Sequence, residues 1–228
     1  MSFLDILLQT PIFQGVSKSK LTTCLEKHCV EFLKFQSGEK IVSVGEEFTH
    51  IKFLISGKML NVTGNKAGNL LVKELYAAPN LISGNYIFGI ETHSICTSIA
   101  QTDVGVMQIA KEDFLELLRK EQIFMINYLN FLSARSQSYF NTMMSISTGE
   151  LNERFAQWVL LLTHKKAEEI VLSIRLDEMA KLLGDSRDNL HLMLQDLKKK
   201  KLLTFNENEI KIVNRHALAD IVHDEDLD

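Results

Sequence analysis

The chain has 228 residues, of which 46% are hydrophobic and 24% are charged, a balance typical of a globular protein with a buried core and unlike that of a disordered chain. Its net charge of −4 excludes a uniformly basic nucleic-acid-binding domain, so affinity for DNA would have to come from a local group of basic side chains. The longest uncharged run, residues 75–90, is interrupted by Pro79 and Gly84, and the N-terminus lacks the basic segment of a signal peptide, so we expect a cytoplasmic protein without a transmembrane helix.

The N-terminal half changes from helical to strand-rich patterning. Residues 1–25 look helical, with breaks at Thr10-Pro11 and near Gly15. From residue 30 to residue 109, short apolar stretches alternate with polar turns, and eight of the 11 glycines lie between residues 38 and 105. Short strands at this spacing predict a β-sandwich or a β-roll.

Residues 111–146 have the periodicity of one long helix. Apolar side chains recur there at heptad spacing, which predicts a coiled-coil seam between two copies of the chain; the alternative is a single core helix of a monomer. Phe124, Tyr128 and Phe131 occupy another face and are expected to pack against the β-rich segment, and the small polar residues 145–149 suit a hinge. The candidate interface consists of Leu118, Met125, Leu129, Leu132, Tyr139 and Met143, continued by Ile146.

Residues 176–198 have the pattern of a helix-turn-helix. A short helix is expected at about residues 177–183, a turn at Gly184-Asp185, and a second helix that begins at Ser186, a residue type that commonly caps helix N-termini. Leu190, Met193 and Leu197 are expected to form the buried face of the second helix, which leaves a polar face for a DNA groove. The flanking elements complete a winged helix: a helix at 151–163, a strand at 171–174, and a hairpin of strands at 202–205 and 209–213.

Several short motifs resemble those of the CRP/FNR family, the regulators of bacterial transcription that include catabolite activator protein. They are Pro11-Ile12-Phe13-Gln14-Gly15, Phe35-x-x-Gly38-Glu39 with Gly45-Glu46, and Leu54-Ile55-Ser56-Gly57-Lys58, and the long helix and winged helix follow in the family's order. The resemblance implies an α+β protein with a cyclic-nucleotide-binding-like sensory β-roll at residues 1–110, a dimerisation helix at 111–146 and a winged helix-turn-helix DNA-binding domain at 147–228. It also implies a homodimeric DNA-binding regulator, not an enzyme, whose partners are double-stranded DNA, RNA polymerase and a small-molecule effector.

The sensory segment departs from the nucleotide-binding members of that family. Those members hold the cyclic phosphate and ribose with a Gly-Glu pair and an Arg, and the position that corresponds to the Arg is Ser94. No Lys or Arg lies between residues 75 and 102, so we expect an effector other than cyclic AMP bound in the usual mode. The polar candidates in this segment, which could line a pocket for an uncharged ligand or simply form turns, are Ser83, Gly84, Asn85, Ser94 and Thr97.

The sequence assigns no cofactor. An iron–sulfur cluster needs about four cysteine ligands, and the chain has three cysteines, an odd number that we interpret as reduced thiols: Cys24, Cys29 and Cys96. The sensory half also contains His28, His50 and His93, but none lies in a haem-ligand motif, so surface or hydrogen-bonded histidines are the simpler interpretation.

The second helix of the helix-turn-helix, which begins at Ser186, corresponds to the recognition helix of the family. The resemblance implies that its N-terminal end faces the DNA groove. There, Arg187 could donate two hydrogen bonds to guanine, and Asp188 could accept one from cytosine. Lys198 begins a run of four lysines that could contact phosphate or simply cap the helix. The full set of DNA-contacting candidates is Ser186, Arg187, Asp188, Asn189, His191 and Lys198.

Two features leave alternatives open. Leu192 stands where the family often has a second Arg, so it could contact a thymine methyl group or pack in the core, and in either case the preferred DNA site should differ. The alternative function is a β-roll ligand-binding module whose winged helix contacts protein instead of DNA, and the acidic residues 224–228 are compatible with it.

Overall fold

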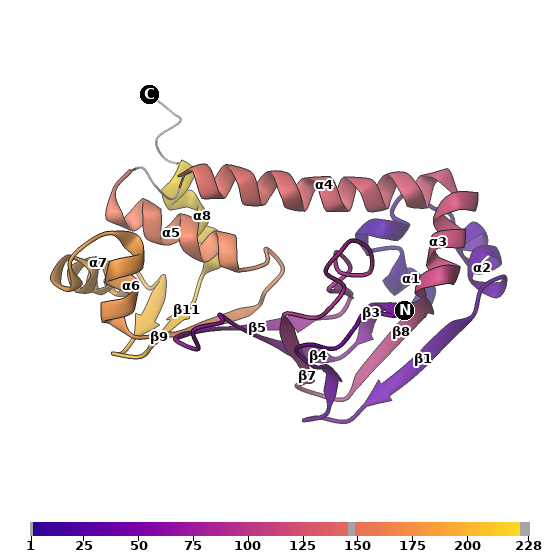
Figure 1. The fold of residues 1–228 in the computed structure, drawn as a ribbon, viewed down its shortest axis with the longest axis horizontal. Helices are drawn as coiled ribbons and strands as arrows, with labels where there is room; N and C mark the ends of the chain where they lie inside the picture. Colours follow the sequence, from indigo (N-terminus) through magenta and orange to yellow (C-terminus); the bar gives the residue numbers. More distant parts are fainter. Residues whose placement is uncertain (1, 146–148, 224–228) are drawn as a thin grey trace. The chain divides into compact units, whose positions relative to one another are not determined.

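The computed structural model describes residues 2–145 and 149–223, which form two compact units of an α+β protein, as the sequence predicted. The first unit consists of residues 1–61 and 76–135, and the second consists of residues 62–75 and 136–228. These units do not coincide with the expected ranges 1–110, 111–146 and 147–228, because residues 62–75 pack with the C-terminal segment. Figure 1 shows the strand-rich first unit in indigo to magenta and the helix-rich part of the second in orange to yellow.

The strands of the first unit form two sheets. One sheet has the strand order β1-β8-β3-β6, and all its neighbouring strands are antiparallel. The other contains β4, β7 and β2 in that order, and β7 and β2 are antiparallel. Phe53 on β3 lies opposite Met107 on β8 and Leu81 on β6, and both Phe53 and Met107 are fully buried. The strands that lie wholly in the first unit are β1 (Val30–Phe35), β2 (Lys40–Val42), β3 (His50–Ser56), β6 (Asn80–Ile82), β7 (Cys96–Ala100) and β8 (Val104–Ala110). Two strands have residues in both units, β4 (Lys58–Gly64) and β5 (Leu70–Ala77).

The helices beside these strands differ from expectation at one point. The predicted helix over residues 111–146 is interrupted at Glu121, whose extended backbone (φ −121°, ψ 93°) separates two helices. Leu118 precedes this break and is only 7% exposed in the core of its own unit, so it has no surface to offer a second copy of the chain. The helices are α1 (Phe3–Leu7), a short 3-10 turn (Pro11–Phe13), α2 (Lys18–Glu26), α3 (Lys111–Lys120) and α4 (Gln122–Ser145).

Aromatic side chains fix the first turns of α4 in the core of the first unit. The Phe124 ring lies 5.4 Å from the ring of Phe13, and the Tyr128 ring lies 5.3 Å from that of Phe114. Tyr128 also donates a hydrogen bond from its hydroxyl to the carbonyl of Gly84 at 2.9 Å, and burial raises the pKa of this phenol to about 12. Tyr128 therefore packs against the β-rich segment as expected, and Phe124 packs against Phe13 of the 3-10 turn. Phe131 is partly buried, with its ring 6.3 Å from that of Tyr128.

The C-terminal part of the second unit is a winged helix. Its helices and strands surround an apolar cluster that includes Phe155, Trp158, Leu172, Leu194 and Ile210. The helix-turn-helix, the hairpin and the preceding strand agree with the sequence prediction within about two residues, as helix boundaries usually do. The elements are α5 (Leu151–Leu162), β9 (Glu169–Ile174), α6 (Leu176–Leu183), α7 (Arg187–Lys199), β10 (Leu203–Phe205), β11 (Glu209–Ile212) and α8 (Arg215–His223).

The hairpin of residues 62–75 extends the sheet of the winged helix. β5 pairs antiparallel with β9 from Leu70 opposite Ile174 to Leu75 opposite Glu169, so the unit has the strand order β10-β11-β9-β5. Val72 is 5% exposed and belongs to the apolar cluster of the winged helix. The Glu74 carboxylate accepts a hydrogen bond from the backbone N–H of His164 at 2.6 Å. The hairpin is therefore part of the core of the second unit.

Some predicted features lie outside the described residues. They are Ile146 of the heptad seam, residues 146–148 of the expected hinge, and the acidic residues 224–228. The three cysteines are free thiols, of which Cys24 and Cys96 are buried and Cys29 is exposed. Among the described residues, no helix is both long enough and apolar enough to span a membrane.

Candidate nucleic-acid interface

The turn between α6 and α7 is built by two residues with clear local roles. Gly184 ends α6 in the left-handed conformation (φ 68°, ψ 38°), which glycine adopts at little steric cost. Ser186 caps α7 because its hydroxyl accepts a hydrogen bond from the backbone N–H of Asn189 at 3.1 Å. Asp188 lies in the first turn of α7, where a carboxylate favours the helix dipole. The N-terminal turn of α7 is therefore capped and polar.

The buried face of α7 consists of Leu190, Leu194 and Leu197. The sequence analysis placed Met193 on this face instead of Leu194, but Met193 is only partly buried at its edge. The two positions are equally compatible with helical spacing, and tertiary packing selects Leu194. Leu192 is 64% exposed, so of the two roles considered for it, core packing is excluded.

Arg187 lies at the exposed start of α7 and is held by two carboxylates. Its Nε lies 3.2 Å from Oδ1 of Asp177 on α6. Its Nη2 lies 3.4 Å from Oε1 of Glu207, which is in the turn of the β10–β11 hairpin, the wing of the winged helix. Because all three side chains are substantially exposed, both ion pairs are weak and can exchange for a stronger bidentate acceptor.

His191 and Lys198 gather around one aromatic ring of the wing. The rings of His191 and Phe205 are nearly perpendicular (79°) at a centroid distance of 5.5 Å, and the Lys198 ammonium lies 5.7 Å from the centroid of the Phe205 ring. His191 also bonds to the side chain of Gln195, one turn further along α7, at 2.8 Å. The contacts with Phe205 join the middle and the end of the recognition helix to the wing.

Asn189 is engaged within the helix-turn-helix. Its side-chain amide donates to Oδ1 of Asp185 at 2.8 Å, and the other oxygen of Asp185 lies 3.0 Å from Nη2 of Arg154 on α5. The hydrogen bonds from Asn189 and from the Ser186 backbone, together with Arg154, hold the pKa of the Asp185 carboxyl below its ordinary value. Asn189 therefore stabilises the turn in this structure, whereas the sequence analysis considered it only for contacts to bases or phosphate.

An open hollow of about 480 Å³ lies between α7 and the wing. The structure brings four of the six sequence candidates together there, because Arg187, Asp188, His191 and Lys198 line it, while Ser186 and Asn189 do not. Gln195 could have been predicted to lie beside His191, because residues four apart share one face of a helix. The residues of the wing could be assigned to this site only once the fold was known. The lining residues that sequence reasoning missed are Leu176, Gln195, Phe205, Asn206 and Glu207.

The effector candidates of the first unit are mostly engaged in internal hydrogen bonds. Ser94 is buried, and its hydroxyl donates to the carbonyl oxygen of Cys96 at 2.7 Å. The hydroxyls of Ser83 and Ser94 lie 3.9 Å and 3.7 Å from the sulfur of Cys96. Thr97 accepts from the backbone N–H of Val44 at 3.3 Å. The structure thus brings Ser83 and Ser94 together around Cys96, a residue that the sequence analysis did not place among the effector candidates.

The exposed face of α4 carries the apolar side chains that the heptad pattern singled out. Met125 and Leu129 are exposed on the part of α4 in the first unit, and Tyr139 and Met143 are exposed on the part in the second unit. Leu132 is partly buried. Ile126, Phe140 and Met144 are further exposed apolar side chains on the helix. Large apolar side chains in such number on one helix are unusual for a monomer surface.

Comparisons with known proteins agree with this geometry. Residues 153–221 match the family model of the Crp-like helix-turn-helix domain. The fold is similar to that of catabolite activator protein from Thermus thermophilus, with 20% sequence identity, a TM-score of 0.54, and coverage of 93% of this chain and 98% of that one. It is also similar to CLP, a c-di-GMP-responsive global regulator of Xanthomonas campestris, with 13% identity, a TM-score of 0.52, and coverage of 86% and 99%. No curated protein sequence matches the chain significantly.

Proposed function

We propose that this chain, which has a Crp-like helix-turn-helix domain and the fold of catabolite activator protein, regulates transcription by binding a specific DNA site as a homodimer. The observation that carries the proposal is the hollow between α7 and the wing, which is lined by exposed polar side chains of the helix. A recognition helix with a polar N-terminal face enters the major groove, and a wing beside it contacts the backbone.

In this proposal, Arg187 reads the DNA sequence. It exchanges its ion pairs with Asp177 and Glu207 for two hydrogen bonds to a guanine. Lys198 and the lysines that follow it contact phosphate, a contact that strengthens binding without selecting a sequence. Exposed Leu192 is available to a thymine methyl group.

The DNA-binding proposal is tested by selecting binding sites from random duplex DNA with the full chain. A near-palindromic sequence should be enriched, because a symmetric dimer presents two recognition helices to two half-sites. Binding to the selected site should weaken as salt rises, since phosphate contacts release counterions. If no sequence is enriched and the winged helix instead captures a protein, the alternative function as a protein-binding module gains support and the DNA-reading role is contradicted.

The homodimer is proposed to form along α4. Its exposed apolar side chains between residues 125 and 144 would be covered by the same face of a second copy, the usual arrangement of a two-stranded coiled coil. Leu129→Glu should therefore yield monomers at concentrations where the wild type is dimeric, as measured by analytical ultracentrifugation. Ala134→Glu is the matched control, because Ala134 is exposed on the opposite side of α4. Equal dimerisation of both variants would contradict this interface.

The effector is proposed to be something other than a cyclic nucleotide held by an arginine. Ser94, at the position of the family's Arg, uses its hydroxyl within the first unit and carries no positive charge. A buried cyclic phosphate would lack the cation that such binding requires. Calorimetric titration with cyclic AMP should give no binding heat at micromolar concentration, and a micromolar dissociation constant would contradict the proposal. RNA polymerase is the proposed partner at the promoter, which copurification on promoter DNA would test.

A further inference from the structure

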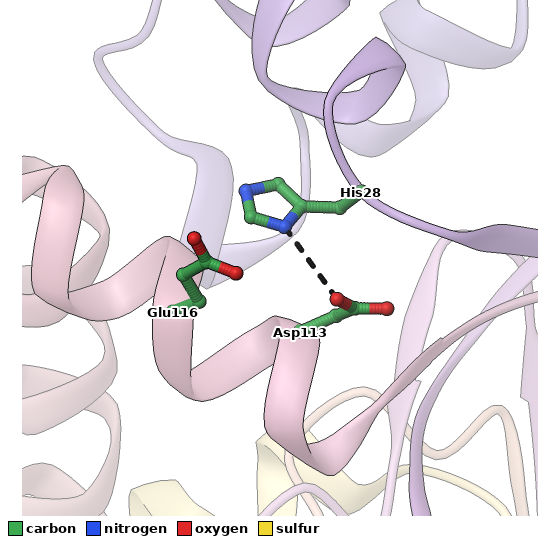
Figure 2. A group of neighbouring side chains, drawn as sticks. All are labelled: His28, Asp113 and Glu116. Atoms are coloured by element: carbon green, nitrogen blue, oxygen red, sulfur yellow. Dashed lines mark ion pairs between the residues drawn. The ribbon is translucent and has the colours of Figure 1, made fainter.

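Three side chains of the first unit converge at a place that the proposed function does not use. His28 follows the end of α2, and Asp113 and Glu116 lie three residues apart on α3, so both carboxylates are on one face of that helix. Figure 2 shows the imidazole ring of His28 facing the two carboxylates. One ligand atom from each side chain lies within 4.8 Å of the others.

The imidazole of His28 is the most informative member of this group. Its side chain is 5% exposed, and its Nδ1 is buried without a hydrogen-bond partner. The nearest carboxylate oxygen, Oδ1 of Asp113, lies 3.8 Å away, which is beyond hydrogen-bond distance. Buried ring nitrogens in native proteins usually have a hydrogen-bond partner, and residues 2–145 and 149–223 supply none to this nitrogen.

The two carboxylates supply the charge that a cation would need. Asp113 is partly exposed, and Glu116 is about half exposed and forms an ion pair with Lys120 one turn further along α3. The Lys120 ammonium holds the pKa of the Glu116 carboxyl below its ordinary value. Because this ion pair is exposed to water, Glu116 can exchange Lys120 for another cation at little cost.

We propose that His28, Asp113 and Glu116 bind a divalent transition-metal ion such as Mn²⁺ or Zn²⁺, with water completing the coordination. One imidazole nitrogen with two carboxylate oxygens is a common donor set for these ions. Metal–ligand bonds of about 2.0–2.2 Å require the three ligand atoms to move closer together than they are here. Rotation of the exposed Glu116 side chain away from Lys120, together with rotation of the partly exposed Asp113 side chain, supplies this movement, while buried His28 stays in place.

A metal ion at this site would join two elements that are far apart in the sequence. His28 belongs to the connection between α2 and β1, and the two carboxylates belong to α3, which leads through Glu121 into α4. Binding would therefore stabilise the first unit at the start of the helix that is proposed to form the dimer. Saturating metal should raise the thermal midpoint of the full chain, since a ligand that binds only the folded state stabilises it.

The test measures binding of Zn²⁺ and of Mn²⁺, each alone, to the full chain after treatment with a chelator. Calorimetry should show one ion per chain for the wild type, and Glu116→Gln should weaken binding at least about tenfold. Glu112→Gln is the matched control, because it removes the same charge from an exposed position on α3 that is not in the cluster. Pulsed electron paramagnetic resonance of bound Mn²⁺ should show coupling to nitrogen that is lost in His28→Ala and retained in His93→Ala.

Three results would overturn the proposal. One is a wild-type dissociation constant weaker than about 1 mM for both ions, which would leave the group as the loose contact between His28 and Asp113. The second is wild-type affinity in Glu116→Gln, and the third is nitrogen coupling that persists without His28. If His28→Ala does not fold, Glu116→Gln decides the question, because the Glu116 side chain is half exposed and its removal leaves the core intact.

Discussion

Replacement of Arg187 by alanine should separate sequence reading from general DNA affinity. A bidentate contact to guanine discriminates by about 1–3 kcal/mol, and each exposed ion pair that Arg187 gives up, one to Asp177 and one to Glu207, is worth roughly 0.2–1 kcal/mol. At mid-range values the two ion pairs together offset about 1.2 kcal/mol of a contact worth about 2 kcal/mol, so the net contribution of one subunit is about 0.8 kcal/mol. A homodimer on a palindromic site doubles this to roughly 1.6 kcal/mol, which corresponds to a loss of affinity of about 15-fold.

The assay is fluorescence anisotropy with two labelled duplexes, the selected site and a scrambled sequence of the same composition, at several salt concentrations. Arg187→Ala should lose affinity for the selected site and keep nearly all of it for the scrambled one. Glu207→Gln is an informative companion, because it removes one competing ion pair from each subunit and should strengthen specific binding by the dimer by up to about 30-fold. Equal losses on both duplexes, or none on the selected site, would refute the reasoning that Arg187 reads a base.

Three further predictions concern the second unit, whose unfolding can be followed by the fluorescence of Trp158, the only tryptophan and a buried member of its core. Ser186→Ala removes the cap of α7 and should lower the free energy of unfolding by about 0.5–2 kcal/mol in a urea titration; an unchanged midpoint would contradict the capping role. Val72→Ala leaves a cavity in the shared core and should cost about 1–3 kcal/mol by the same measurement, whereas no loss would show that the hairpin is not part of this core. The pKa of Asp185 is lower in the folded chain than its ordinary value of 3.8. The hydrogen bonds and the ion pair of the Asp185 carboxylate, including the one to Arg154, therefore stabilise the fold at neutral pH, and this stabilisation is lost as the pH falls below 3.8. Asp185→Asn should reduce this acid destabilisation, and an acid-unfolding curve identical to that of the wild type would argue against the contribution.

The helix-turn-helix could be predicted from the sequence because its signals are local. Gly184 is suited to the left-handed end of α6, Ser186 is suited to cap α7, and each acts within a few residues of its own position. The order of the motifs in the β-rich segment likewise indicated the fold. Local periodicity did not show that the long helix is broken at Glu121, because α3 and α4 each continue the same apolar pattern across the break.

The contacts between distant segments were decided by the tertiary structure alone. β5 pairs with β9 through backbone hydrogen bonds, which any residues except proline can form, so nothing in residues 70–75 identifies β9 as their neighbour. The partner of Arg187 in the wing, Glu207, is an exposed turn residue without a distinctive motif. The sequence by itself determined that the chain has a helix-turn-helix and which residues begin its second helix. Only the fold decided which side chains hold Arg187, and which carboxylates face His28, because such pairs depend on packing between elements and not on spacing along the chain.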